Sequence, residues 1–231
     1  MTTTVIVPST THYSDAWGPF VALFRKFWPD CPYKLVLITD FKSDPWDGDD
    51  AIVIGRDYGW CKNLVRGLNE IKSDHVIMLQ EDFFLNAPTD TAYIQKALEM
   101  TIDKNLACFR LYPCPGPDWP LGDDYGLISV GKPYRVSCQA AIWSREELYE
   151  IAGRPQINSP REFEIDGTNF VNSEHTVCQY YSVKRDPNQW PLQYYCSAIT
   201  RGEWNPDAVT FVKSLGIPIN NSRRPTQRVI T

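Results

Sequence analysis

The amino-acid sequence predicts an α/β fold with a mostly parallel central sheet that helices cover on both faces. The apolar runs of the amino-terminal half show no polar alternation, which is typical of strands buried on both faces. Segments with a helical spacing of apolar residues separate these runs, and strands that alternate with helices usually pair in parallel. The chain has 231 residues, 43% of them hydrophobic and 22% charged, which suits one large globular domain.

Five apolar runs of the first half are the predicted strands. They span residues 4–8, 35–39, 51–54, 75–79 and 107–112. Between them, helical spacing predicts helices over 20–27, 60–71 and 93–98. Asp90 can cap the last of these helices.

The second half begins with a segment rich in turn-forming residues. Residues 113–135 hold five prolines and four glycines, which predicts a long loop, and loops of this length are usually functional or mobile. A return strand is expected over 136–143, and a late strand over 194–200. We expect both strands to join the same fold as the first half.

Two capping boxes predict helices in the second half. Ser144-x-x-Glu147 and Ser159-x-x-Glu162 each place a hydroxyl before a first turn that carries a glutamate three residues later. A last helix is expected over 206–215, followed by a loose polar tail.

Composition and charge narrow the possible functions. The net charge is −5, from 23 Lys and Arg against 28 Asp and Glu, and a mildly acidic surface argues against broad nucleic-acid binding, which needs a basic face. No apolar run is long enough to span a membrane. The seven cysteines form no CxxC pair, which indicates buried, reduced thiols, notably Cys108, Cys138, Cys178 and Cys196. We expect a soluble, cytoplasmic protein, with peripheral attachment to a membrane left open.

Polar side chains follow the predicted strands where each strand ends. Pro8 closes the first strand and Thr10 follows it, Asp40 follows the second, and Gln80-Glu81-Asp82 follows the fourth. In open parallel sheets, ligands bind beyond the carboxyl ends of the strands. These residues are therefore the first candidates for a binding site.

The acidic pair Glu81-Asp82 is the strongest of these signals. It lies between the apolar runs 75–79 and 83–85, where unpaired carboxylates are costly. Mg²⁺ or Mn²⁺, which prefer oxygen ligands, can neutralise such a pair. The alternatives are a solvated turn or a carboxylate paired with Arg110.

Residues 60–82 carry a resemblance to a known family. Asn63-Leu64-x-x-Gly67-Leu68 is followed by Ile71-x-x-Asp74-x-Val76-Ile77-x-Leu79-Gln80-Glu81-Asp82. This pattern resembles the core of GT-A-fold glycosyltransferases of the family-2 type, in which a helix with Asn and Gly precedes an apolar strand and a DxD-type motif. Gln80 stands at the first Asp of that motif and Asp82 at the second. The first two predicted strands also resemble the first two strands of these enzymes. The resemblance therefore covers about residues 4–112.

The resemblance implies a GT-A-like three-layer sandwich in a single domain, 1–231. Residues 1–112 would form the half that binds a nucleotide sugar, and 113–231 the acceptor-side half and the tail. The implied reaction moves a sugar from a nucleotide-diphosphate donor to a glycan, a lipid-linked glycan or another hydroxyl acceptor, with Mn²⁺ or Mg²⁺ held by Asp82. The implied donor-site residues are Pro8, Thr10, Asp40, Trp60, Lys62, Asn63, Gln80 and Glu81.

An inverting enzyme of this kind also needs a carboxylate that deprotonates the acceptor hydroxyl. Residues 161–167 (REFEIDG) resemble the acidic segment on the acceptor side of these enzymes. Because the capping box explains Glu162, Glu164 is the first candidate for the base and Asp166 the second. The resemblance also makes His175, late in the chain, a candidate for a further metal ligand, because some GT-A enzymes use a histidine in this role.

Two other functions stay open. A nucleotidyltransferase would share the α/β layout, but it should carry a Gly-rich loop with Lys or Arg after the first strand, and residues 8–12 (PSTTH) contain neither. A degenerate glycosyltransferase domain could instead bind saccharides or act as a scaffold, since Gln80 replaces an Asp. The donor sugar and its base, the acceptor, the anomeric outcome, the need for metal and the oligomeric state also stay open.

Overall fold

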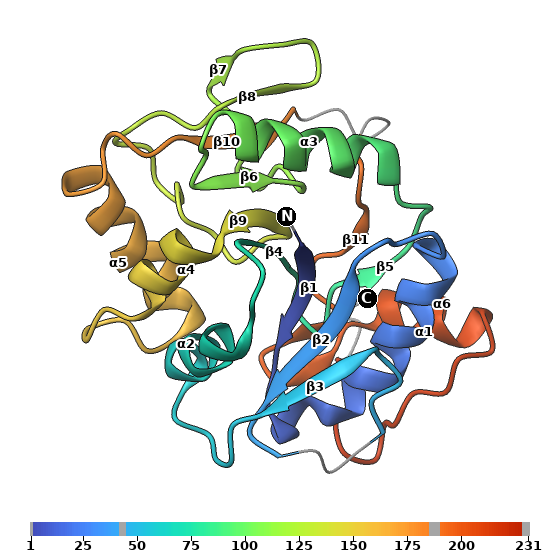
Figure 1. Cartoon of the computed structure of the whole chain (residues 1–231). Helices are drawn as coiled ribbons and strands as arrows, with labels where there is room; N and C mark the ends of the chain where they lie inside the picture. Colours follow the sequence, from blue (N-terminus) through green and yellow to red (C-terminus); the bar gives the residue numbers. More distant parts are fainter. Residues whose placement is uncertain (1, 42–44, 185–189, 228–231) are drawn as a thin grey trace.

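A computed structural model describes residues 2–41, 45–184 and 190–227, and its centre is a nine-stranded sheet (Figure 1). In spatial order its strands are β3 (Asp50–Val53), β2 (Lys34–Thr39), β1 (Thr3–Pro8), β4 (His75–Met78), β9 (Ala141–Ser144), β6 (Cys108–Arg110), β10 (Tyr180–Val183), β8 (Tyr125–Leu127) and β7 (Trp119–Pro120). Strands β3, β2, β1 and β4 are parallel, and β6 is parallel to β10. Strand β9 runs antiparallel to both β4 and β6. The predicted mostly parallel sheet is confirmed.

Helices cover both faces of the sheet (Figure 1). One face packs against α1 (Trp17–Phe27), α3 (Thr91–Asp103) and α6 (Pro206–Ser214). The other packs against α2 (Trp60–Glu70), α4 (Arg145–Ala152) and α5 (Pro160–Ser173). A 3-10 helix, η1 (Thr11–Ala16), leads into α1, and two short ladders pair β5 (Phe84–Leu85) with β11 (Tyr194–Tyr195) and β12 (Ile199–Thr200) with β13 (Glu203–Trp204).

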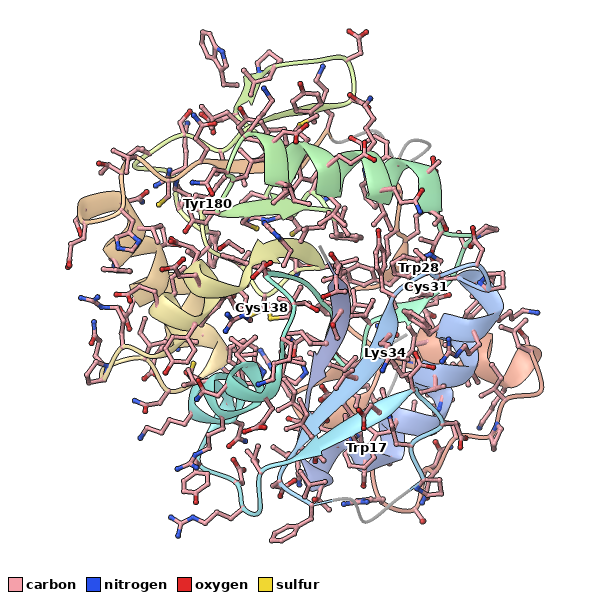
Figure 2. All side chains as sticks on the ribbon, in the orientation of Figure 1. Trp17, Trp28, Cys31, Lys34, Cys138 and Tyr180 are labelled. Atoms are coloured by element: carbon pink, nitrogen blue, oxygen red, sulfur yellow. The ribbon has the colours of Figure 1, made fainter. Side chains whose placement is uncertain are left out.

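The alternation of side chains in β1 shows why the sheet needs two helical layers. Val5 and Val7 pack into the core that contains Trp17 and Trp28, labelled in Figure 2, whereas Ile6 packs into the core on the α2 side. None of the three β1 side chains has exposed surface. Burying each contributes about 1.5–3 kcal/mol, so a strand without polar residues is stable only between two layers.

The predicted helix starts are confirmed by their caps. The Asp90 side chain accepts from the backbone amide of the third residue of α3 at 2.9 Å. Ser159 and Glu162 form a reciprocal capping box at the start of α5. Ser144 caps α4, but the Glu147 carboxylate turns away from it and contacts the 175–180 segment.

Three predictions about the second half need correction. The return strand expected over 136–143 starts only at Ala141, and the late strand over 194–200 is two short strands separated by residues 196–198. The loop over 113–135 contains the hairpin β7–β8, and β10 was not predicted. For the two shortened strands the physical reason is shared: residues 138–139 and 196–197 line a pocket instead of extending a ladder.

The cysteine prediction is confirmed in part. All seven thiols are free, but of the four singled out only Cys108 is buried; Cys138 and Cys178 are half-buried and Cys196 is exposed.

The carboxyl-terminal tail was predicted to be loose, but up to residue 227 it packs against the rest of the chain. Arg224 is buried, pairs with Asp15 at 3.1 Å and donates to the carbonyl of His12. The rest of the tail, 228–231, lies outside the described residues. Among the helices of the described ranges, none has the length and apolarity that crossing a bilayer requires.

Candidate active site

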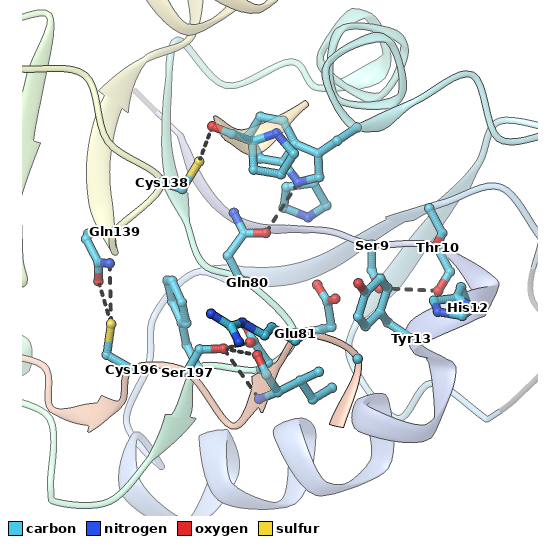
Figure 3. Close-up of a pocket in the computed structure, with 18 of the residues that line it drawn as sticks. Ser9, Thr10, His12, Tyr13, Gln80, Glu81, Cys138, Gln139, Cys196 and Ser197 are labelled. Carbon is cyan, nitrogen blue, oxygen red and sulfur yellow. Dashed lines mark hydrogen bonds between the residues drawn. The ribbon is translucent and has the colours of Figure 1, made fainter. Parts of the chain in front are cut away.

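A pocket of about 620 Å³ opens beyond the carboxyl ends of β1 and β4 (Figure 3). Its wall comes from both halves of the chain: the loop after β1, the start of α2, residues 80–83, residues 138–139, α5 and residues 196–202. Seven of the predicted site residues line it, namely Pro8, Thr10, Trp60, Gln80, Glu81, Asp82 and Glu164. Four predicted residues do not: Asp40, Lys62, Asn63 and Asp166.

The acidic pair lies at the floor of this pocket, where Glu81 is buried and Asp82 is half-buried. Glu81 is 7% exposed. Burial raises the pKa of Glu81, and the nearby charge of Asp82 raises it further. Burial raises the pKa of Asp82 as well. Within the described ranges, no lysine or arginine forms an ion pair with either carboxylate, although the charge of Arg224 offsets part of the rise in both pKa values. A cation in the pocket would therefore favour the ionised form of the pair.

The carboxyl-terminal half supplies a partner for Asp82. The Ser197 hydroxyl donates to the Asp82 carboxylate, and the backbone amide of Ala198 donates to the Asp82 carbonyl at 2.9 Å. These bonds hold the segment between β11 and β12 against the end of β4. Figure 3 shows Ser197 and Glu81 at the same opening.

Gln80 lies where the resemblance places the first acid of a DxD-type motif. Its Oε1 accepts from the indole Nε1 of Trp60 at 3.4 Å. Its Nε2 is buried and has no hydrogen-bond partner within the described part of the chain. An unsatisfied buried donor costs about 1–3 kcal/mol, so this amide is available to a ligand oxygen.

Glu164 reaches the pocket from the first turns of α5. Its Oε1 accepts from the Ser137 hydroxyl at 3.1 Å and from the Cys138 amide at 3.0 Å. These two bonds fix the carboxylate, while no described residue hydrogen-bonds its Oε2. Asp166 lies two positions further along α5, about 200° around the helix, and does not line the pocket.

Asp40 and Asn63 hold the loops around the pocket. Asp40 Oδ1 accepts from the amide and the hydroxyl of Thr11 at 2.7 and 2.8 Å, which anchors η1. Burial acts to raise the pKa of Asp40, but these bonds outweigh it and the pKa is lowered. Asn63 donates to Asp57 at 2.8 Å and accepts from the Tyr58 amide at 2.9 Å, which orders the turn before α2.

Two further candidates point elsewhere. The Lys62 side chain is exposed on α2 and does not reach the pocket. Arg110 is buried and donates to the backbone carbonyls of Pro115, Tyr134 and Arg135. It therefore does not neutralise the acidic pair, and that alternative from the sequence is wrong.

Several lining residues were missed by sequence reasoning. His12, Asp57, Gln139, Cys196 and Ser197 all line the pocket. His12 and Asp57 follow strand ends, so the rule that found Asp40 applies to them too. Gln139 and Cys196 contact each other (Figure 3). These two and Ser197 gave no sequence signal, because they lie in runs that resemble strands.

Solved structures share this fold at low sequence identity. TarS 1–349 from S. aureus superposes with a TM-score of 0.53 and 12% identity over 93% of this chain, which spans 64% of that protein's length. TarS 1–349 in complex with UDP superposes with a TM-score of 0.50 and 12% identity over 96% of this chain and 68% of that fragment. The 2-C-methyl-D-erythritol 4-phosphate cytidylyltransferase from Thermus thermophilus superposes with a TM-score of 0.54 and 12% identity. The match covers 94% of this chain and 99% of the cytidylyltransferase.

Sequence comparison adds no relative: no protein-family model matches the chain, and no curated protein matches it. The structural likeness rests on arrangement in space alone. The chain therefore has the GT-A-like α/β sandwich that the sequence predicted, a fold that it shares with enzymes that bind nucleotides.

Proposed function

We propose that the protein is a glycosyltransferase that moves a sugar from a nucleotide-diphosphate donor to a hydroxyl of a glycan or lipid-linked glycan, with inversion. The observation that carries this proposal is that the Glu81-Asp82 pair and the Glu164 carboxylate line one pocket. The first comes from the donor half of the chain and the second from the acceptor half. Glycosyl transfer needs both kinds of group, one beside the diphosphate and one beside the nucleophile.

The acidic pair fits a divalent cation. A buried and a half-buried carboxylate, neither in an ion pair with a basic residue of the described ranges, form an oxygen-only donor set, which suits Mg²⁺ or Mn²⁺. Asp82 and Glu81 would hold the ion, which supplies charge neutralisation for the leaving diphosphate when bound. Gln80 would contribute its free amide donor to a phosphate or ribose oxygen.

Glu164 would act as the base. Its Oε1 is fixed by Ser137 and Cys138, so Oε2 can take the proton of an acceptor hydroxyl. As the acceptor oxygen bonds to the anomeric carbon, the bond from that carbon to the diphosphate breaks. The proton goes to Glu164 and the nucleoside diphosphate leaves. A single displacement of this kind inverts the anomeric configuration.

The products of the reaction test this proposal against its nearest rival. Incubation with nucleotide sugars and an acceptor mixture should release nucleoside diphosphate. Nucleotidyl transfer would instead consume a nucleoside triphosphate with a sugar phosphate and release pyrophosphate. The loop after β1, residues 8–12, carries no glycine, lysine or arginine, so we expect no pyrophosphate. Saccharide binding without any turnover would instead support the scaffold.

A further inference from the structure

We propose a second, separate metal site, for Zn²⁺, formed by His175, Cys178 and Glu147. In the described ranges, this is the only group of three His, Cys, Asp or Glu side chains close enough to share one ion. One ligand atom from each lies within 4.8 Å of the others.

The site lies at the opposite ends of the central strands from the candidate active site. Ser144, at the end of β9, pairs with His75, where β4 begins. A pocket of about 410 Å³ opens there, and it shares no residue with the active-site pocket. Tyr180, labelled in Figure 2, donates to Glu147 at this pocket. His175 therefore cannot serve the Glu81-Asp82 pair.

The distances suit a tetrahedral ion. His175 Nδ1 is 3.2 Å from Glu147 Oε2, and Cys178 Sγ is 3.7 Å from the same oxygen. Zn²⁺ bonds of about 2.0–2.3 Å place two tetrahedral ligands about 3.3–3.8 Å apart. The His-x-x-Cys spacing is held by a turn in which the Cys178 amide donates to the His175 carbonyl at 3.2 Å.

The donor types favour zinc over magnesium. A thiolate, an imidazole and a carboxylate form a mixed set that selects zinc among the abundant divalent ions. On binding, the Cys178 thiol releases its proton to solvent and the sulfur takes the metal bond. Three protein ligands leave a fourth position facing the pocket, which water can fill.

The surroundings hold the carboxylate and supply negative charge. The Tyr180 hydroxyl donates to Glu147 Oε1 at 2.6 Å, which leaves Oε2 toward His175 and Cys178. Partners of this kind fix ligand orientation in metal sites. Glu146 and Glu150 also line the pocket. The nearby Arg135 donates to the carbonyls of Val171 and Cys178 instead of to the carboxylate.

Zinc here would join two parts of the chain that no strand pairing connects directly. Glu147 lies in the first turn of α4, whereas His175 and Cys178 precede β10, an internal strand of the sheet. The ion would therefore stabilise the placement of β10, and its role is separate from sugar transfer.

The first test uses the unmodified protein. After chelator treatment, Zn²⁺ is added and alkylation of each cysteine by iodoacetamide is followed by mass spectrometry. We expect zinc to slow alkylation of Cys178 at least tenfold and to leave the exposed Cys114 unchanged. Equal rates at Cys178 with and without zinc would overturn the proposal.

The second test measures affinity by competition with a chromophoric chelator. The wild-type protein should bind one equivalent of Zn²⁺ at this site. Cys178→Ser and His175→Ala should each weaken binding at least tenfold, and Tyr180→Phe by about 10–100-fold. Cys114→Ser is the matched control and should bind like the wild type. Binding that survives Cys178→Ser and His175→Ala in folded protein, or fails in the wild type, contradicts the site.

Discussion

The Ser197 hydroxyl donates a hydrogen bond to the Asp82 carboxylate, across 115 positions of the sequence. This bond connects the acid that follows β4 with the segment between β11 and β12. The acidic floor of the pocket is therefore completed by the carboxyl-terminal half. A donor site built from the first 112 residues alone would lack this contact.

Removing that contact should weaken both folding and ligand binding. Ser197→Ala deletes the hydrogen bond to Asp82, which is worth about 1.5–3 kcal/mol if the carboxylate is charged, and frees Asp82 to rotate. It also removes the local contacts of the hydroxyl with the Ile199 backbone. We expect a lower melting temperature and at least fivefold weaker binding of Mn²⁺ with nucleotide, measured by calorimetry. Ser214→Ala, which removes a similar hydroxyl from the surface of α6, is the control. Equal effects of the two substitutions would show that Ser197 has no special role.

The acidic pair should make stability depend on pH. Burial and mutual repulsion raise the folded-state pKa of Glu81 and burial raises that of Asp82. The folded state thus keeps protons that the unfolded chain releases near pH 4. The stabilisation from these protons is fully present below that pH and is lost as pH rises through the raised pKa values.

Melting curves without metal should therefore show a decline in stability toward neutral pH. The decline should be smaller in Glu81→Gln/Asp82→Asn, which cannot ionise at these positions. Saturating Mn²⁺ should reduce it in the wild type, because the cation stabilises the ionised pair. The same pH profile in the wild type and the double variant would exclude a raised pKa at the pair.

Glu164 and Asp166 test the proposed base. Glu164→Gln keeps the hydrogen-bonding shape but cannot accept a proton, so turnover should fall by about 10²–10⁴-fold. Nucleotide affinity should stay within twofold, because the donor side is untouched. Asp166→Asn, on the same helix but outside the pocket, should keep at least half of the activity. The reverse result would assign the base to Asp166.

Two glycines test the packing of the helical layers. A Cβ on Gly67 of α2 would overlap the Ile38 side chain of β2, whereas a Cβ on Gly18 of α1 meets no atom within 4 Å. Gly67→Ala should destabilise by about 1–3 kcal/mol, and Gly18→Ala should stabilise by up to about 1 kcal/mol. Denaturant unfolding measures both. A neutral Gly67→Ala would contradict the close contact of α2 with the sheet.

The parts of the fold that the sequence predicted are those where one local rule decides. Residues of β1, β2 and β4 are apolar and β-branched because both faces are buried, and Asp90 and Ser159 fit the caps of their helices. By contrast, β10 holds two tyrosines and a serine, a mixture that fits strand and loop alike. Its place beside β6 follows from tertiary pairing.

The candidate site was predictable only on its donor side. Glu81 and Asp82 stand out because acids between apolar runs are costly. Ser197 and Gln139 lie in runs that read as strands, and their place in the pocket depends on backbone that leaves the sheet at 136–140 and 196–198. Asn63 fits the motif of the resemblance, yet its hydrogen bonds go to Asp57 and Tyr58. Such departures from a local pattern are common at functional sites.

The central claim, that this pocket binds a nucleotide diphosphate through a cation at Asp82, is tested most directly by melting temperature. The wild type and Asp82→Asn are heated with UDP, GDP, CDP and dTDP, each with and without Mn²⁺. Ligand at 100 times its dissociation constant adds about 2.7 kcal/mol, which is readily measured. We expect a shift with one nucleotide that requires Mn²⁺ and is lost in Asp82→Asn. No shift with any nucleotide, or an equal shift in the variant, would contradict it.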